Sequence, residues 1–232
     1  MMIKIMNLSK MYGNDEALNN VTVEIHEGKI YGLFGNNGSG KTTLINIIAR
    51  RIFQTEGLIE VDGNLLLANS NVNHLVFCTN NERYIADERY KGYLRRISRL
   101  NGHFDYSIAI NIMKSFNMKD NQFLYKLTDR QHSIFKISMA FAMNAKYTFF
   151  DESTLHLDAK DREQFYKILL KMYNKTQNTY VIATHYIDEV ENLTEDVIVI
   201  DQGRIIEETS IEAIQMQEIS LVQYVSSKVE VV

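Results

Sequence analysis

The sequence predicts an α/β domain with a mostly parallel sheet, because strand-like and helix-like segments alternate along most of its 232 residues. A glycine-rich stretch at 35–42 lies directly between a dense apolar run and a segment with helical spacing, which supports this class. The interval from about 83 to 145 interrupts the alternation with helical segments. We expect this interval to be a helical subdomain inserted into the core.

The first 35 residues are predicted to form strands. MIKIMNL and VTVEI alternate apolar and polar side chains, which is the period of a half-buried strand. KIYGLF is a denser apolar run and fits a central strand that ends at a glycine. A helix over TLINIIAR and two short strands, GLIEVDG and HLVFCT, are expected to follow.

The second half continues the pattern. LTDRQ opens a helix, and the strand at 147–150 ends in two carboxylates. A helix at about 159–174 and a strand at 179–184 precede DVIVID and GRIIEE, which predict a terminal hairpin. We therefore expect one domain over 1–232, divided into the following parts: the core with its β subdomain at about 1–82 and 146–210, the helical subdomain at about 83–145, and a C-terminal helix and tail at about 211–232.

Composition narrows the classes of function. With 25 basic and 29 acidic residues the net charge is −4, so no nucleic-acid partner is expected. The single cysteine, Cys78, fits a reducing compartment. No stretch approaches the roughly 18 apolar residues that a transmembrane helix needs. A role at a membrane would therefore require a second polypeptide to supply the span.

One motif predicts phosphate binding. The stretch matches G-x-x-x-x-G-K-[ST] and reads Gly35-Asn36-Asn37-Gly38-Ser39-Gly40-Lys41-Thr42, followed by Thr43. Glycines let successive backbone N–H groups point at phosphate oxygens, and the next helix adds the partial positive charge of its N-terminus. Lys41 can reach the β- and γ-phosphates, and the Thr42 hydroxyl can ligate Mg²⁺. A simple glycine turn would leave this lysine and the hydroxyls unexplained.

Residues at the ends of two strands can supply the groups for metal binding, water activation and contact with the γ-phosphate. Asp151 would hold Mg²⁺, largely through water, and Glu152 would orient or deprotonate the attacking water. His185 ends the strand TYVIAT and could hydrogen-bond the γ-phosphate. The simpler alternatives are an acidic strand end and a surface histidine.

These residues, in this order, resemble the ABC ATPases of transporters over essentially the whole chain. The resemblance implies a P-loop NTPase core with an N-terminal antiparallel β subdomain. It also implies that the core binds ATP and Mg²⁺, with Lys41, Glu152 and His185 as catalytic residues. It implies that Tyr12 stacks on adenine and that Asp158 belongs to the D-loop, Leu155-His156-Leu157-Asp158. It also implies a head-to-tail dimer on ATP and a separate transmembrane permease subunit, which together place the chain at the cytoplasmic face of the membrane.

Two segments depart from the family. Its signature is usually Leu-Ser-Gly-Gly-Gln, and here the same register reads Leu127-Thr128-Asp129-Arg130-Gln131. Thr128 keeps a hydroxyl for the nucleotide, but Asp129 would repel phosphate and Arg130 would attract it, so the net effect stays open. The simpler alternative is a helix start capped by Thr128. The loop that usually offers glutamine to Mg²⁺ has Asn80 or Asn81 instead, and Asn80 is preferred.

A signature serves the ATP of the partner subunit, so the altered segment compromises the partner's site and leaves this chain's own loop intact. We therefore hypothesise pairing with a different ATPase subunit, whereas a homodimer would carry the altered segment at both sites. The expected function is ATP hydrolysis that powers export, with peptides such as bacteriocins, lantibiotics or phenol-soluble modulins as the suggested substrates. The alternatives are an ATP-binding partner with weak hydrolysis and a non-transport ABC ATPase.

Overall fold

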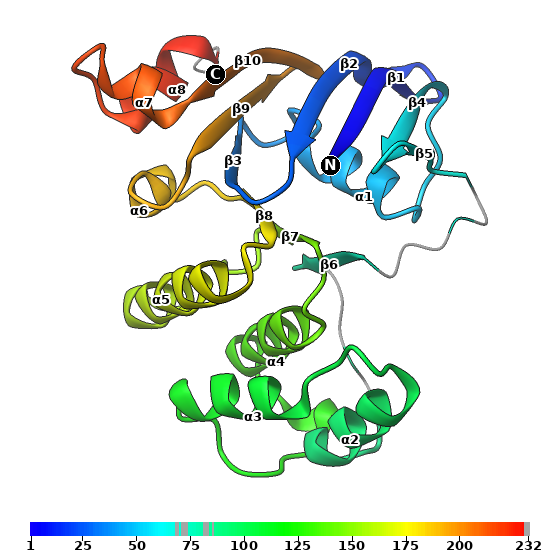
Figure 1. Ribbon diagram of the computed structural model, residues 1–232, viewed down its shortest axis with the longest axis vertical. Helices are drawn as coiled ribbons and strands as arrows, with labels where there is room; N and C mark the ends of the chain where they lie inside the picture. Colours follow the sequence, from blue (N-terminus) through cyan, green and yellow to red (C-terminus); the bar gives the residue numbers. More distant parts are fainter. Residues whose placement is uncertain (68–69, 71–73, 81–83, 85, 230–232) are drawn as a thin grey trace.

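The computed structural model describes residues 1–67, 70, 74–80, 84 and 86–229 (Figure 1). Within these residues a six-stranded sheet has the order β10 (Arg204–Ser210), β9 (Asp196–Asp201), β3 (Ile30–Phe34), β8 (Thr179–Ala183), β7 (Tyr147–Asp151) and β6 (Leu75–Thr79). All neighbours in it run parallel except β9 and β10, which form the predicted hairpin. The same residues form a four-stranded antiparallel sheet, in the order β2 (Asp15–His26), β1 (Met2–Tyr12), β4 (Glu56–Val61) and β5 (Asn64–Leu65). The predicted α/β class is confirmed.

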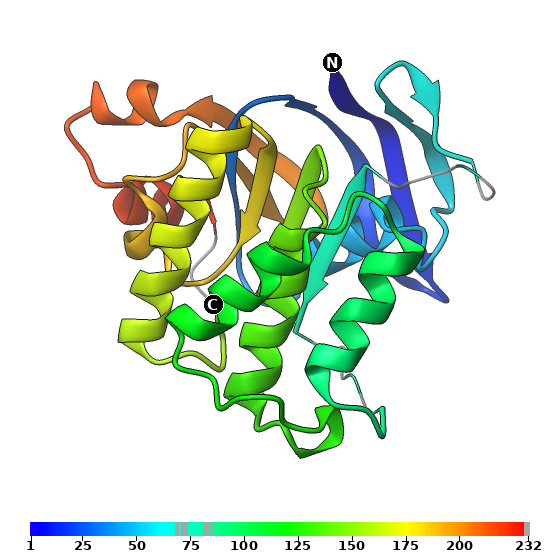
Figure 2. The same cartoon turned by 60° about the horizontal axis from the view of Figure 1, so that its bottom comes forward.

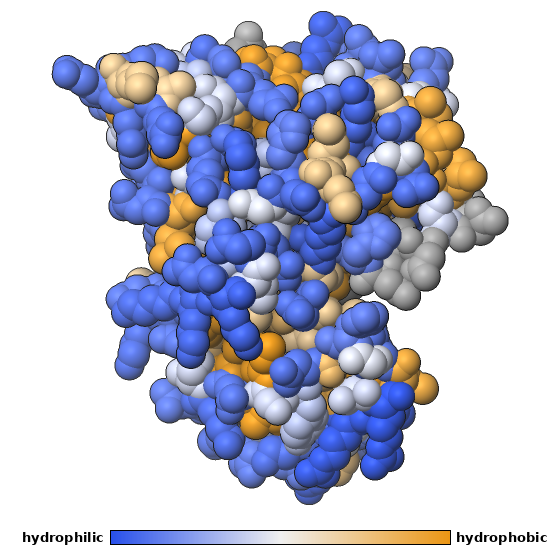
Figure 3. Space-filling model, in the orientation of Figure 1, coloured by the Kyte–Doolittle hydropathy of each residue, from blue (hydrophilic) through white to orange (hydrophobic). Residues whose placement is uncertain are grey.

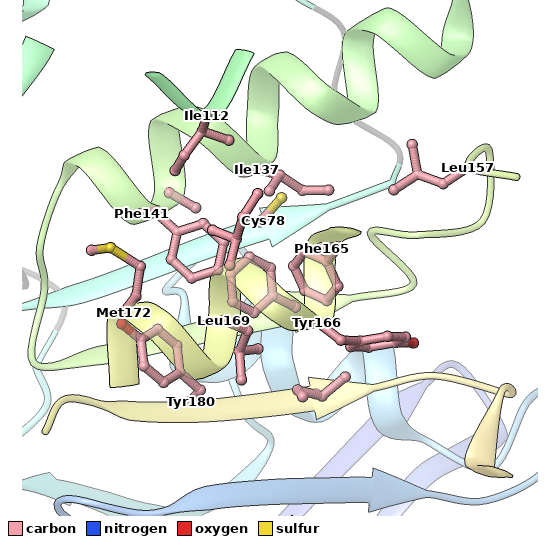
Figure 4. Packing of buried hydrophobic residues seen from close by; sticks show 14 of the residues in the cluster. Cys78, Ile112, Ile137, Phe141, Leu157, Phe165, Tyr166, Leu169, Met172 and Tyr180 are labelled. Carbon is pink, nitrogen blue, oxygen red and sulfur yellow. The ribbon is translucent and has the colours of Figure 1, made fainter. Parts of the chain in front are cut away.

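Successive side chains of a strand point to opposite sides of a sheet, and in the large sheet both sides are covered by other elements. On one side Phe150 and Tyr180 belong to the cluster formed with the helices α4 (Asp129–Ala142) and α5 (Ala159–Thr176) (Figure 4). On the other side Phe149 and Val181 pack with α1 (Lys41–Ile48) and the antiparallel sheet. The molecule therefore has three layers, and the dense apolar runs of the sequence are strands covered from both sides.

The interval predicted to be helical contains α2 (Tyr90–Leu100), α3 (Tyr106–Ser115), the 3₁₀ turn η1 (Leu124–Lys126) and α4. These helices lie together at one end of the molecule (Figures 1 and 2). Buried residues of α2 and α4, including Leu94 and Phe135, belong to the same cluster as Phe150 of the sheet. Figure 3 shows apolar side chains gathered between this helical end and the rest of the molecule. The proposed boundaries of the subdomain remain a prediction.

The C-terminal segment forms two short helices, α7 (Ile211–Gln215) and α8 (Leu221–Lys228), where a single helix and a tail were expected. Ile214, Leu221 and Val225 are buried in the large cluster, which explains why this segment is ordered. None of the helices in the described ranges is both long and apolar enough to cross a membrane.

Candidate functional site

The glycine-rich stretch is a tight loop between β3 and α1. A Cβ atom at Gly35 would lie 2.0 Å from the carbonyl oxygen of Ile200, and one at Gly40 would lie 2.8 Å from that of Ala17. Gly40 also has a positive φ of 110° at the start of α1, where no side chain caps the helix. Only glycine fits both positions, and the uncapped first turn of α1 can donate its amides to an anion.

A cavity of about 160 Å³ opens at this loop. Its walls combine the loop with the start of α1 and one carboxylate, and they consist of Ala17, Asn37, Gly38, Gly40, Lys41, Thr42, Thr43 and Glu152. Asn36 and the buried Ser39 lie within the loop itself, where the Ser39 amide donates to the Asn36 carbonyl at 3.1 Å. The phosphate-binding residues proposed from the motif therefore lie together.

Lys41 is buried beneath the loop. Its Nζ donates to the carbonyl oxygens of Gly35 at 2.7 Å and Asn36 at 2.9 Å, both uncharged acceptors. Burial lowers the pKa of the Lys41 ammonium, and the carboxylates of Glu152 and Asp151 partly oppose this shift. Nζ also lies 3.5 Å from the Ser39 hydroxyl, which is uncharged as well, so this buried cation would gain strongly from an anionic phosphate. The lysine and the loop therefore fit the phosphate chain of a nucleotide.

Thr42 and Asp151 connect α1 to the end of β7. The Thr42 hydroxyl donates to Oδ1 of Asp151 at 3.3 Å. Burial raises the pKa of Asp151, the Thr42 hydrogen bond lowers it, and the neighbouring Glu152 raises it further. A hydroxyl and a carboxylate are oxygen ligands of the kind that Mg²⁺ takes, together with phosphate oxygens and water. Among the described residues no group of three or more His, Cys, Asp or Glu side chains could hold a metal ion.

Glu152 and His185 form a direct pair. Nδ1 of His185 lies 2.8 Å from Oε2 of Glu152. Glu152 has a φ of 49°, a left-handed conformation that non-glycine residues rarely adopt, and its amide donates to the Ala183 carbonyl at 2.9 Å. Such backbone strain is common where a side chain must be aimed at a site. The predicted base and the predicted histidine are thus brought together, although they are expected from separate strands.

Asn80 follows β6, the edge strand beside β7. In the ladder its neighbour Thr79 pairs with Asp151. Oδ1 of Asn80 is buried and has no hydrogen-bond partner among the described residues. A buried acceptor without a partner is uncommon, and its place beside the Asp151 end of the ladder fits a metal ion or its water as the missing partner. The alternative, Asn81, lies outside the described residues.

Tyr12, Thr128 and Asp158 are among the predicted binding residues that do not line the cavity. Tyr12 is 48% exposed at the end of β1, with Nζ of Lys10 5.0 Å from its ring centre. Thr128 accepts from the Gln131 amide, and the Gln131 side chain accepts from the Thr128 amide, so Thr128 caps α4 whether or not it also meets a nucleotide. Asp158 caps α5 by accepting from the Asp161 amide at 2.8 Å. Their roles toward a nucleotide stay predictions.

The segment 127–131, which differs from the family signature, is joined to α5 by an ion pair between Arg130 and Asp161. Arg130 donates through Nη2 to Oδ1 of Asp161 at 2.8 Å and through Nε to Oδ2 of the same carboxylate. Nη2 also reaches the Phe116 carbonyl at 3.3 Å. The positive charge of Arg130 is therefore balanced within the chain, which weakens the attraction for phosphate considered from the sequence.

Sequence reasoning missed the side chains that hold the end of β6. Lys136 of α4 donates to the carbonyl oxygens of Thr79 and Asn80, Ser153 donates to that of Cys78, and Arg51 reaches the Thr79 hydroxyl. One signal was available for Lys136, since it is a single charge within the apolar helical run Ile134 to Ile137. The other contacts join positions too distant in sequence to be paired from spacing alone.

A family model described as "ABC transporter" matches residues 18–155, which is more than half of the chain. The chain belongs to the ABC transporter family. As a member of that family it is an ATP-binding domain and an ATPase, in agreement with the loop, the carboxylates and the histidine described above.

Relatives of this ABC domain cover most of its length. It is 26% identical over 224 residues to the methionine import ATP-binding protein MetN of Lactobacillus johnsonii, a match that covers 88% of this chain and 63% of MetN. It is 24% identical over 193 residues to the ABC transporter ATP-binding protein YtrB of Bacillus subtilis, covering 83% of this chain and 66% of YtrB. The chain thus spans just under two thirds of the length of these two relatives.

A solved structure shares the fold of this ABC domain. It is the dimeric, post-hydrolysis state of an ATP-binding cassette bound to ADP and Pi, at a TM-score of 0.77 and 23% identity. The match covers 90% of this chain and 99% of the cassette. At this level of identity the likeness shows the fold alone.

Proposed function

We propose that this ABC domain is the ATP-hydrolysing subunit of a transporter whose membrane-spanning part is a separate permease, and that it works at the cytoplasmic face of the membrane. The observation that carries the proposal is the continuity from Lys41 and Thr42 through Asp151 to the Glu152–His185 pair. Each step of phosphate binding and water activation has a side chain in place along this line.

We assign a distinct role to each residue of the site. Lys41 and the amides of the loop and of α1 bind the phosphates of ATP. Thr42, Asp151 and Asn80 would hold Mg²⁺, which neutralises charge on the β- and γ-phosphates when it is bound. Glu152 orients the attacking water and accepts its proton. An ionised Glu152 accepts from Nδ1–H of His185, which leaves Nε2 of the half-exposed ring available to the γ-phosphate.

Of the remaining predicted residues, Tyr12 would act at this chain's own site, and Thr128 and Asp158 would act at the site of a second subunit. Tyr12 is exposed, as a ring that stacks on adenine has to be. Thr128 and Asp158 are exposed ends of α4 and α5, so each can meet a nucleotide held by a second subunit. The dimeric cassette of the same fold supports a dimer as the assembly in which they would do so, and the family resemblance implies that the two subunits lie head to tail.

We propose a different ATPase subunit as the second member of that dimer. Side chains stand at both signature glycine positions, and Arg130 is engaged with Asp161 rather than available to phosphate. A partner's site completed by this segment would therefore be the weaker one. This chain's own loop would be the stronger site, provided that the partner supplies a glycine signature.

Export, with peptides as the substrate class, is the direction that the overall resemblance supports. The name of MetN describes import, so direction and substrate have to be established with the permease that co-purifies with this chain. Uptake or release of labelled peptides by vesicles that contain both proteins would test them directly. Import of a small solute would overturn the export proposal and leave the ATPase assignment intact.

The decisive test of the site is Glu152→Gln. We expect turnover to fall by roughly 10²-fold or more, because the base is lost, while ATP binding persists. Glu163→Gln removes a carboxylate from an exposed part of α5 and is the matched control, with unchanged turnover expected. A Glu152→Gln protein that hydrolyses ATP like the wild type would contradict the assigned base. Wild-type turnover as low as that of the variant, even with the second subunit present, would favour the weakly hydrolysing alternative.

A further inference from the structure

A lysine is buried inside the helical end of the molecule. Lys136 lies in the middle of α4 and is 5% exposed, and its neighbours Ile134, Phe135 and Ile137 are fully buried. Placing an ammonium in such surroundings is costly unless it is hydrogen-bonded. An apolar side chain would pack there at lower cost, so the contacts of the ammonium are the feature to explain.

The ammonium of Lys136 is bound to the chain at the end of β6. It donates to the carbonyl oxygen of Thr79 at 2.8 Å and to that of Asn80 at 3.0 Å. α4 packs beside β6 at this end of the sheet (Figure 2). Two consecutive carbonyls held by one cation fix the direction in which the chain leaves the strand.

Other side chains hold the preceding residues of β6. The Ser153 hydroxyl donates to the Cys78 carbonyl at 2.6 Å, and Arg51 donates to the Thr79 hydroxyl at 3.2 Å. Of these three anchors, Lys136 is the one that reaches Asn80 itself. The backbone carbonyl from which the Asn80 side chain extends is therefore held from α4.

The position of Asn80 matters because its Oδ1 is buried without a described partner, beside the carboxylate end of β7. Adjacent strands lie about 4.8 Å apart, so the residue after Thr79 is within side-chain reach of the groups around Asp151. The helix that bears Lys136 also begins at the Thr128 cap, about 12 Å away at 1.5 Å per residue. α4 thus connects the surface at Thr128, which is expected to face a second subunit, with the chain at Asn80 beside Asp151.

We propose that Lys136 is a positioning residue for the magnesium–nucleotide site, because its ammonium holds the carbonyls of Thr79 and Asn80 in the place from which the Asn80 side chain reaches the metal or its water. The effect of Lys136 on magnesium binding rests on the proposed function. The contacts of Lys136 with the carbonyls of Thr79 and Asn80 are present in the nucleotide-free chain. A merely structural lysine would affect folding stability without changing the magnesium dependence.

The test compares Lys136→Met, which keeps an unbranched apolar stem, with Lys171→Met, which removes a charge from an exposed part of α5. In nucleotide-free protein, NMR measures the hydrogen exchange of the Thr79 and Asn80 amides. We expect this exchange to accelerate in Lys136→Met alone.

In magnesium titrations, we expect the magnesium concentration for half-maximal hydrolysis to rise about tenfold in Lys136→Met, as for other residues that orient a metal ligand. ATP binding in EDTA should be unchanged. Lys136→Gln keeps a neutral donor and should show smaller changes; it replaces Lys136→Met if that variant does not fold.

The outcomes separate the two proposals. Wild-type protein that neither binds nor hydrolyses ATP overturns the proposed function, whereas the amide exchange still reports on the anchor. Unchanged exchange in a folded Lys136 variant overturns the anchoring. Faster exchange with an unchanged magnesium dependence shows a purely structural lysine and overturns the positioning role.

Discussion

Backbone strain at Glu152 is the clearest residue-scale sign of function. Its φ of 49° costs a side-chain-bearing residue about 1 kcal/mol, which glycine does not incur. We expect Glu152→Gly to have a free energy of unfolding about 1 kcal/mol above that of Glu152→Gln, because both lose the carboxylate but only glycine relieves the strain. Urea unfolding of the two variants measures this difference. Equal stabilities would show that the conformation is not strained in solution.

Asp151 predicts a dependence of stability on pH. Burial raises its pKa in the folded chain above the ordinary value of 3.8, so the native state binds this proton more tightly than the unfolded state does. The stabilisation from Asp151 is therefore complete below pH 3.8 and is lost as pH rises through the folded pKa. We expect Asp151→Asn, without nucleotide, to be more stable than the wild type at pH 7 by roughly 1 kcal/mol, a typical gain at functional sites.

Unfolding of wild type and Asp151→Asn from neutral pH down toward the ordinary pKa of 3.8 measures this effect. The difference should shrink toward the acidic end. Addition of ATP and magnesium should stabilise the wild type more than the variant, since the variant lacks the metal-binding carboxylate. A variant less stable than the wild type at pH 7 would show that the charged carboxylate is well compensated in the free protein.

At the scale of elements, the start of α4 depends on a reciprocal cap. Thr128 and Gln131 each accept the backbone amide of the other. We expect Thr128→Ala to lower the free energy of unfolding by about 1 kcal/mol, whereas Thr128→Ser should change it little because serine caps equally well. Thermal unfolding of the three proteins tests this. Equal losses in both variants would indicate that the threonine methyl group, and not the cap, stabilises α4.

The elements were largely predictable from the sequence, because each is encoded by a local period. The dense apolar runs mark strands buried on both faces, and the loop from Gly35 to Thr42 has a motif that is complete within eight residues. Contacts between elements were not predictable. The Arg130–Asp161 pair and the bond from Lys136 to Asn80 depend on how far each helix is rotated about its axis, which no local pattern specifies. For the same reason, the sequence alone could not show whether Asp129 and Arg130 together attract or repel phosphate.

At the scale of the whole molecule, the altered signature predicts that activity depends on the partner. We expect this chain alone to hydrolyse ATP at least about tenfold more slowly than when mixed with a subunit that carries a glycine signature, because only that partner completes the site at Gly35 to Thr42. Steady-state hydrolysis of each subunit and of the mixture measures this. The double variant Asp129→Gly, Arg130→Gly should raise the activity of the chain alone. Full activity of the unaltered chain by itself would contradict the hetero-dimer.

The site is assembled from segments that are far apart along the chain. The Thr42–Asp151 bond spans 109 residues, and β6 must pair with β7 before Thr79 and Asp151 become neighbours. Contacts of such long range form late in folding, after shorter loops have closed. A nucleotide therefore recognises only the finished fold, so ATP should slow the unfolding of this chain while leaving its folding rate almost unchanged. During synthesis, ATP would protect a completed molecule but could not help an incomplete one to fold.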